Sequence, residues 1–475
     1  MSFKIIPIII LSWFVGILFS QNALLGTIAC IALPYLFVVY KSPLINLYVF
    51  ILTSVSFFGY FNPEFFLHLP GFFKLIDVLF CIFIALYIIR KYQAKYIERL
   101  RPRNGISKVA KRLLWLLIGF TVFQIGLASI KYNVPMIDSF KIGRHYLYFF
   151  IGIFAIDFFY DKKSSIKIIK FLFVIAIIQS LLVILQNIFG GIAFLGYTKI
   201  IDQVIGEDVV RRIYMPAYFY VMAVFTVSFW MAFLRTNIFS KKYLIFIITI
   251  TGIAILLSYT RTLWVTAIVS IIFPMALMQK KVFFRYTILL LSIVLFMGVV
   301  FTFFAGKKTD IIKTRTVSIL DNVIHYKGTF AVRFEENRKR LELIKQNIIL
   351  GGPGFVHPYQ APDVFGFRTL GKLKHSTKVQ TNDSGILTWL LAFGVVGVVW
   401  VLFLLWWMAK LAKKALHLHE EAGLIVGIAS YVVSAWLTSL TTTGFTFSRG
   451  VIFLSIALYI FSFFTGELQF ERLKQ

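Results

Sequence analysis

The sequence is poor in acidic residues and in cysteine. It contains 20 Asp and Glu residues against 49 Lys and Arg, and only two cysteines. Cys30 and Cys81 both fall inside long apolar runs, so we interpret them as core residues and expect neither a disulfide framework nor a thiolate metal site. The sequence also lacks a Gly-rich phosphate-binding loop, Cys or His pairs at metal-ligand spacing, and acidic pairs of the kind that hold a metal–nucleotide complex. We therefore expect no metal and no cofactor.

Apolar residues are present in excess. Hydrophobic residues make up 59% of the chain, and 53 residues are Phe, whereas soluble domains contain roughly 45–50% apolar residues. Runs such as residues 4–20 and 286–304 are long enough to cross about 30 Å of hydrocarbon as helices. We predict an all-α, polytopic transmembrane helical bundle of about fourteen spans. The predicted spans are residues 4–20, 22–40, 43–61, 74–90, 113–130, 146–160, 171–194, 214–234, 243–258, 262–279, 286–305, 385–409, 421–440 and 450–466.

The net charge of +29 is explained by where the cations lie. With the N-terminus inside, the predicted cytoplasmic ends and loops carry about three times as many Lys and Arg as the short outer loops, which follows the positive-inside rule. We therefore predict a multi-pass protein of the bacterial cytoplasmic (inner) membrane with both termini in the cytoplasm, and no nucleic-acid partner. The largest inner loop, Lys91–Arg112, is interpreted as a topology anchor that contacts anionic headgroups.

We predict that the chain has four parts. Residues 1–210 form N-terminal transmembrane helices, and residues 211–305 form central transmembrane helices with outward-facing arginines. Residues 306–384 form one large extracytoplasmic loop, and residues 385–475 form the C-terminal transmembrane helices. Loops of this size are usually functional or disordered. Because residues 330–350 read as a helix that ends at a Gly-rich turn, we expect an ordered loop.

The helix predicted in the large loop is amphipathic. On a helical wheel, one face carries Phe334, Leu341, Ile344 and Ile348. A line of polar residues follows one edge of that face: Arg333, Asn337 and Arg340. An arginine beside a buried face favours an anionic ligand over a role in solubility.

Further cations gather on the predicted outer side. Arg211 and Arg212 precede the eighth span, and Arg261 occupies a minimal turn between two spans. Others are Lys141, Arg144, His145 and Arg449, of which Arg449 taken alone is better explained by snorkelling to headgroups. Arginine binds phosphate through a planar fork of donors and stays charged. Several arginines that converge could therefore hold a diphosphate.

Three stretches carry a family resemblance. They are "RRIYMPAYFY" at 211–220, "SYTRTLWVTAIV" at 258–269, and "VRFEENRKRLELIKQNIILGGPGF" at 332–355, which is followed by "DSGILTWLLAFGVVG" at 383–397. In order and sidedness they resemble the O-antigen ligase and O-antigen polymerase family of polytopic glycosyltransferases. The likeness covers roughly Arg211 to Trp400, whereas the first half of the chain is similar only in hydropathy.

The resemblance implies a metal-independent glycosyl transfer on the outer face of the membrane. Its donor would be an oligosaccharide on undecaprenyl diphosphate, and its acceptor a sugar hydroxyl. Arginines would bind the diphosphate and stabilise the charge that develops as it leaves. Membrane lipids and other membrane proteins of polysaccharide assembly are further expected partners. The candidate arginines are Arg212, Arg261 and Arg333, which match the family pattern, Arg211 as an alternative to Arg212, and Arg338 and Arg340 as additions from the loop helix.

The expected general base departs from the family pattern. Where the family has His-Asn at the start of the span after the large loop, this sequence has Asp383-Ser384. We expect Asp383 to take the proton of the acceptor, with His375 as the second candidate. Asp383 could equally be an N-terminal cap or first-turn acid of the following helix.

The sequence leaves two choices open, one within the family and one between the family and another class of protein. Within the family we favour a polymerase of repeat units over a ligase, because the His-Asn pair is missing. The alternative from another class is a lipid-linked oligosaccharide flippase, which shares the length, the spans and the basic charge. The large outer segment favours the enzyme, because a flippase needs an alternating cavity and short loops.

Overall fold

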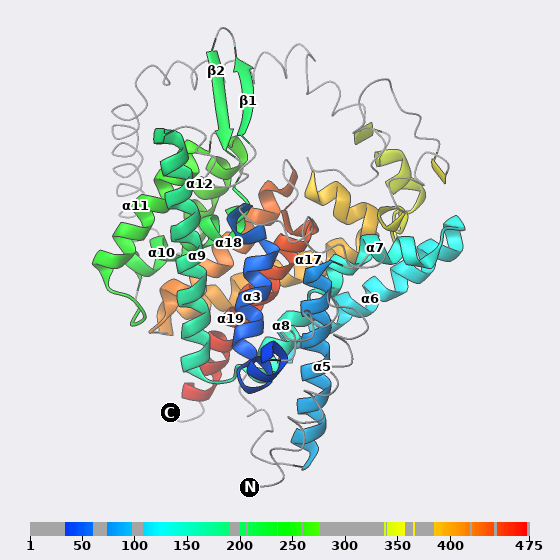
Figure 1. Cartoon of the computed structure of the whole chain (residues 1–475), viewed down its shortest axis with the longest axis horizontal. Helices are drawn as coiled ribbons and strands as arrows, with labels where there is room; N and C mark the ends of the chain where they lie inside the picture. Colours follow the sequence, from blue (N-terminus) through cyan, green and yellow to red (C-terminus); the bar gives the residue numbers. More distant parts are fainter. Residues whose placement is uncertain are drawn as a thin grey trace, which may run out of the picture. The chain divides into compact units, whose positions relative to one another are not determined.

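The computed structural model describes most of the chain (Figure 1). The described residues are 34–59, 74–96, 108–189, 200–205, 208–213, 215–234, 236–258, 260–275, 337–338, 340–356, 364–365, 384–418, 420–440 and 444–472. Two compact units are present. The first comprises Met1–Thr53 and Glu64–Arg101, and the second comprises Ser54–Pro63 and Pro102–Gln475.

The first unit is built on α3 (Pro43–Ser54) and α5 (Leu75–Tyr96). Polar and aromatic contacts join these helices: Asn46 Nδ2 donates to the Leu79 carbonyl at 3.3 Å, and the rings of Phe50 and Phe83 meet edge to face at 5.6 Å. Cys81 lies on α5 and is exposed, so its interpretation as a core residue was wrong. An apolar run does not separate a lipid-facing position from a buried one, because both surroundings are apolar.

The helices of the second unit overlap the predicted apolar runs, except α7, which lies mostly in a segment predicted to be an outer loop. They are α6 (Lys108–Tyr132), α7 (Met136–Leu147), α8 (Phe150–Phe158), α9 (Lys162–Phe189), α10 (Tyr218–Phe233), α11 (Lys241–Leu257), α12 (Arg261–Met275), α17 (Gly385–Leu418), α18 (Ala422–Leu437) and α19 (Ser448–Arg472). Short 3₁₀ turns are also present: η2 (Ser56–Gly59) follows α3, η5 (Pro353–Phe355) precedes α17, and η6 (Thr438–Leu440) and η7 (Gly444–Thr446) lie between α18 and α19.

Four described helices are long and apolar enough to cross a membrane. They are Lys108–Tyr132, Lys162–Phe189, Gly385–Leu416 and Ser448–Gly466. A fifth candidate is the pair Pro34–Lys41 and Pro43–Ser54, which is bent by 116°. The protein is therefore a helical, multi-pass membrane protein by length and composition, and the number of fourteen spans stays a prediction. The predicted spans 4–20 and 286–305 lie outside the described residues.

The interior of the second unit is centred on α18, whose residues 422–436 are all buried. Small residues allow a close approach to α10: a Cβ on Gly423 would meet the Met231 Cα at 2.5 Å, and one on Gly427 would meet the Val227 Cα at 2.6 Å. Two glycines one turn apart are typical of tightly packed membrane helices, because dispersion contacts rather than water exclusion hold such helices together.

The sixth predicted span, residues 146–160, is not one straight helix. The α7 helix ends at Leu147, and α8 is only nine residues long, or about 13.5 Å. A tight turn joins them, with Tyr148 and Phe149 donating backbone hydrogen bonds to carbonyls three residues earlier. Residues 150–156 of α8 are all buried. This segment is therefore a core element that is too short to cross the bilayer alone.

A β-hairpin departs from the all-α expectation. Strands β1 (Ile200–Ile205) and β2 (Asp208–Ile213) pair antiparallel, with Ile205 opposite Asp208 and Asp202 opposite Arg211. The signal was present in the sequence, since two runs rich in Ile and Val are separated by only the two residues Gly206 and Glu207. Arg211 and Arg212 therefore lie on a strand rather than in an irregular loop.

Candidate functional site

The structure places five of the eight predicted site residues. Arg211 and Arg212 are the fourth and fifth residues of β2, and Arg261 is the first residue of α12. Arg338 and Arg340 belong to the loop helix, by which we mean helical residues 337–338 and 340–346. The other three lie outside the described residues: Arg333, His375 and Asp383. The convergence of the arginines on one ligand therefore stays a prediction.

The two arginines of the loop helix have opposite surroundings. Arg340 is only 3% exposed, and its Nη1 atom donates to Asn337 Oδ1 at 3.0 Å. The side chain of Arg338 is 68% exposed, and its Nε atom lies 4.0 Å from Glu342 Oε1. A buried guanidinium is costly to keep and usually marks a functional site or a paired charge, whereas an exposed pair contributes little. Arg340 is thus the stronger candidate for binding an anion.

The helical wheel predicted only part of the buried face. Ile344 is buried as expected, but Leu341 and Ile348 are 46% and 50% exposed. The buried residues are Arg340, Leu343 and Ile344, of which the two apolar ones form a cluster with Leu391 of α17. The wheel placed Arg340 on the edge of the apolar face, whereas the structure places it on the face that packs.

The loop helix is joined to α17 where that helix is broken. Gly394 has φ 59° and ψ −156°, which interrupts the helix between residues 393 and 395. The amides that the break releases find partners in the turn after the loop helix: Val395 N donates to the Ile348 carbonyl at 2.8 Å, and Val396 N to the Ile349 carbonyl at 3.3 Å. We call this contact the Gly394 joint. The backbone amides at the break are therefore hydrogen-bonded, as backbone amides must be in an apolar environment.

Glycines allow this close backbone contact. Gly352 N donates to the Leu391 carbonyl at 3.0 Å, and Gly351 and Gly352 have φ angles of 75° and 110°. A Cβ on Gly351 would lie 2.6 Å from Gly394 N, and one on Gly354 would lie 2.7 Å from Ala392 N. The Gly-Gly-Pro-Gly sequence that ends the predicted helix is therefore required for docking as well as for termination.

Two sets of contacts hold the loop helix to α17. Residues 348 and 349 are hydrogen-bonded to residues 395 and 396, and Leu343 and Ile344 form an apolar cluster with Leu391.

The C-terminal end of α6 holds the same turn from another side. Tyr132 Oη donates to Asn347 Oδ1 at 2.9 Å, and Lys131 Nζ donates to the same oxygen. Gln124 Nε2 donates to the Leu350 carbonyl. These polar residues were not singled out from the sequence, because each is a single residue in an apolar helix and its partner is more than 200 positions away.

The predicted cations of α7 differ from one another in their surroundings. Lys141 Nζ lies 2.8 Å from Asp138 Oδ1. His145 is half-buried as a residue, but its Nε2 atom is buried, and loss of hydration lowers the pKa of the imidazole to about 4. At neutral pH His145 is therefore uncharged, so its inclusion among the outer cations was wrong.

The α7 helix also contacts the turn that follows the loop helix. The ring of Phe355 in η5 lies 6.0 Å from the ring of Tyr146.

Arg449 is a structural residue. Its Nε donates to the Ser54 carbonyl at 2.8 Å, its Nη1 to the Pro216 carbonyl at 3.4 Å, and its Nη2 to Ser56 Oγ at 3.3 Å. The guanidinium is half-buried among these acceptors, so snorkelling to headgroups does not fit it. Three carbonyl or hydroxyl oxygens from distant segments cannot be foreseen from a single arginine in the sequence.

Comparison with known proteins supports the resemblance in the part of the chain that contains the loop helix. Residues 244–404 match the sequence model of the O-antigen ligase family. This segment includes α12 with Arg261, the large predicted loop and the Gly394 joint, whereas Arg211 and Arg212 precede it. No curated protein matches the chain. The family resemblance is confirmed for residues 244–404, and the match supports a membrane protein that ligates or polymerises glycans.

Proposed function

We propose that this protein transfers an oligosaccharide from undecaprenyl diphosphate to a sugar hydroxyl at the outer face of the cytoplasmic membrane. In this reaction the acceptor oxygen forms a bond to the anomeric carbon of the donor, and the bond from that carbon to the diphosphate oxygen breaks. The proton of the acceptor passes to a base, and the lipid diphosphate leaves as an anion. Chain growth by polymerisation and transfer of a finished chain by ligation share this chemistry.

The observation that carries the proposal is the buried Arg340 inside the matched segment. Its burial, the docking of its helix on α17 and the match over residues 244–404 together support a positioned cation at this site. We propose that Arg340 binds the diphosphate with Arg261 and Arg333, and that Arg338 contributes at the exposed rim. Arg211 and Arg212, on β2, are proposed to bind the outer part of the substrate. A fixed guanidinium stabilises the departing charge without reorganisation, which is why no metal is needed in this scheme.

We propose Asp383 as the general base, because it directly precedes Ser384 and α17, the helix on which the loop helix with Arg340 docks. Asp383→Asn keeps the size of the side chain but removes the basic oxygen, so we expect transfer to be strongly reduced. The measurement is the rate of glycan transfer by the purified variant. Full activity of Asp383→Asn would exclude this role and leave His375 as the base.

The runner-up function is a flippase for the same lipid-linked oligosaccharide. The family match over residues 244–404, which includes the large predicted outer loop, favours the enzyme over the flippase.

The experiment that separates the two functions is reconstitution. The purified chain is placed in vesicles that contain a fluorescently labelled, undecaprenyl-diphosphate-linked repeat unit, and the products are separated by electrophoresis. We expect a ladder of longer glycans, or a single transferred product when only a distinct acceptor is supplied. Movement of the labelled lipid across the bilayer without any new glycosidic bond would contradict the proposal and favour the flippase.

A further inference from the structure

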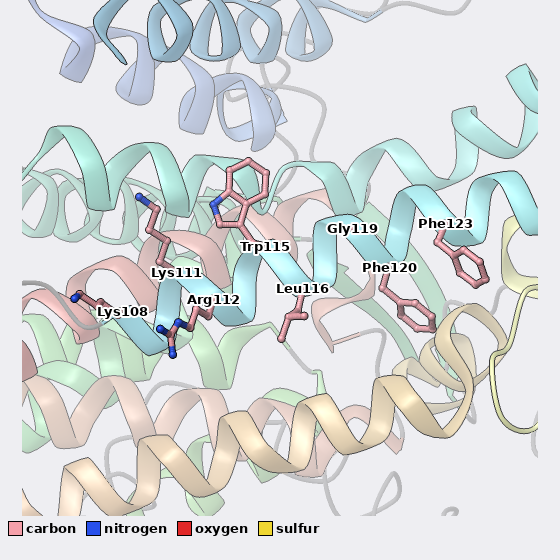
Figure 2. A pocket seen from close by; sticks show the side chains of 8 residues that line it. All are labelled: Lys108, Lys111, Arg112, Trp115, Leu116, Gly119, Phe120 and Phe123. Atoms are coloured by element: carbon pink, nitrogen blue, oxygen red, sulfur yellow. The ribbon is translucent and has the colours of Figure 1, made fainter. Parts of the chain in front are cut away.

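An open groove runs along α6. It has a volume of about 830 Å³ and is lined by residues between Lys108 and Phe123 of this helix. Figure 2 shows the side chains of Lys108, Lys111 and Arg112 at one end and those of Phe120 and Phe123 at the other. The groove therefore has a basic end and an apolar end.

The basic end offers two cations to a ligand. Lys111 is already paired with Asp157, at 2.6 Å between Nζ and Oδ1. Lys108 and Arg112 are exposed, and they lie one helical turn apart on the same helix. They stand where the predicted topology places the cytoplasmic headgroup region, at the end of the basic loop Lys91–Arg112.

The apolar part of the groove is exposed in the protein. Leu116 is 65% exposed, Trp115 41% and Phe123 50%. Gly119 lies between them, and a Cβ built on it meets nothing within 4 Å. From Lys108 to Phe123 the helix rises about 22 Å, which exceeds the thickness of one leaflet, about half of a hydrocarbon layer of about 30 Å, by roughly the depth of a headgroup. These dimensions fit one headgroup with the acyl chains of one leaflet.

The basic end of the groove is remote from the proposed donor site, whereas its apolar end borders the Gly394 joint, where the rings of Phe120 and Phe393 lie 5.8 Å apart. Asn347 and the turn after the loop helix contact Lys131 and Tyr132, at the opposite end of α6. The 25 residues of this helix span about 37 Å, so its two ends lie at opposite sides of a bilayer. An anion held by Lys108 and Arg112 therefore differs from the diphosphate proposed for Arg340.

We propose that this groove holds one anionic phospholipid of the cytoplasmic leaflet, with its phosphate at Lys108 and Arg112 and an acyl chain along Leu116, Gly119 and Phe123. Charge complementarity selects the headgroup, and the apolar floor selects a lipid over a soluble phosphate. The site goes beyond a general attraction of the basic loop to the membrane, because a shaped groove continues from the cations into the hydrocarbon. It does not depend on the proposed glycosyl transfer.

Native mass spectrometry of the full chain tests this site. The protein is released from detergent micelles that contain either phosphatidylglycerol or phosphatidylcholine with the same acyl chains. We expect the wild type to retain one phosphatidylglycerol and no phosphatidylcholine. Gly119→Leu fills the groove and is expected to lower the retained fraction at least fivefold, and Lys108→Ala with Arg112→Ala is expected to do the same.

Matched controls come from the same helix and the same predicted side of the membrane. Gly126 also has nothing within 4 Å of a built Cβ, so Gly126→Leu adds the same side chain outside the groove and is expected to retain the lipid. Lys162→Ala with Lys163→Ala removes two exposed cations of α9 and is expected to have no effect. Equal retention by the wild type and Gly119→Leu, or equal retention of both lipids, would overturn the site. Retention of a polyprenyl diphosphate in place of phosphatidylglycerol would overturn it as well.

Discussion

Arg340→Lys is expected to lower the rate of glycan transfer about 100-fold, because removing one donor from a developing oxyanion typically costs 10²–10³ in rate. Lysine keeps the charge but loses the planar fork that can bind two phosphate oxygens at once. Arg340 is buried and its helix is docked on α17, so a lysine there has little freedom to find the same geometry. The measurement is the initial rate of ladder formation in reconstituted vesicles.

The Arg340→Lys variant also loses the hydrogen bond from Nη1 to Asn337 Oδ1, and such a bond contributes about 1 kcal/mol to the free energy of unfolding. Lys345→Ala is the matched control, because it removes an exposed cation from the same loop helix, and we expect it to change the rate less than twofold. If Arg340→Lys transferred glycan at the wild-type rate, Arg340 would be a structural cation like Arg449 and the diphosphate assignment would fail.

Substitution of the other proposed arginines tests whether Arg340 acts together with them on one diphosphate. Arg261→Lys and Arg333→Lys are expected to lower the rate as Arg340→Lys does, since all three are proposed to share one diphosphate. Effects of residues that act as a unit are not additive, so a double variant should be little worse than either single one. Independent, multiplying effects would instead indicate that the arginines act at separate places.

Helix positions could be predicted from the sequence because twenty consecutive apolar residues leave few alternatives in a membrane. The α9, α10, α18 and α19 helices lie on predicted spans for this reason. The orientation of a helix was harder to predict. Leu341 and Ile348 are as apolar as Ile344, and a protein interior and a lipid phase attract all three equally, so the wheel could not tell which of them packs.

Contacts between distant segments account for the rest. Nothing in the sequence around Arg449 or Asn347 singles these residues out. Their roles depend on hydrogen bonds to carbonyls and side chains far away in the chain. The resemblance placed the Gly-Gly-Pro-Gly turn and the span that contains Gly394 in one family pattern, but it predicted no contact between them. That contact, in which amides at the break in α17 donate to carbonyls of the turn, appears only in the structure.

Gly394→Ala is expected to separate the loop helix from α17 and to abolish glycan transfer. At φ 59° and ψ −156° an alanine is strained by about 1–3 kcal/mol, and its Cβ would also overlap the Ile349 carbonyl oxygen. The carbonyl belongs to a backbone that is itself fixed by Gly352, so it cannot move aside without breaking the hydrogen bonds of Val395 and Val396. Arg340 would then lose the packing that positions it.

Hydrogen exchange distinguishes this local change from general unfolding. In the wild type the amides of Val395, Val396 and Gly352 should be protected, and in Gly394→Ala they should exchange at least tenfold faster. Residues 422–436 of α18 should stay protected in both, because they pack on α10 away from the joint. Gly126→Ala is the control, since this helical glycine has open space around it and alanine favours a helix by about 0.5–1 kcal/mol. Unchanged protection of Val395 and Val396 in Gly394→Ala would mean that the joint does not depend on glycine, and would contradict this prediction.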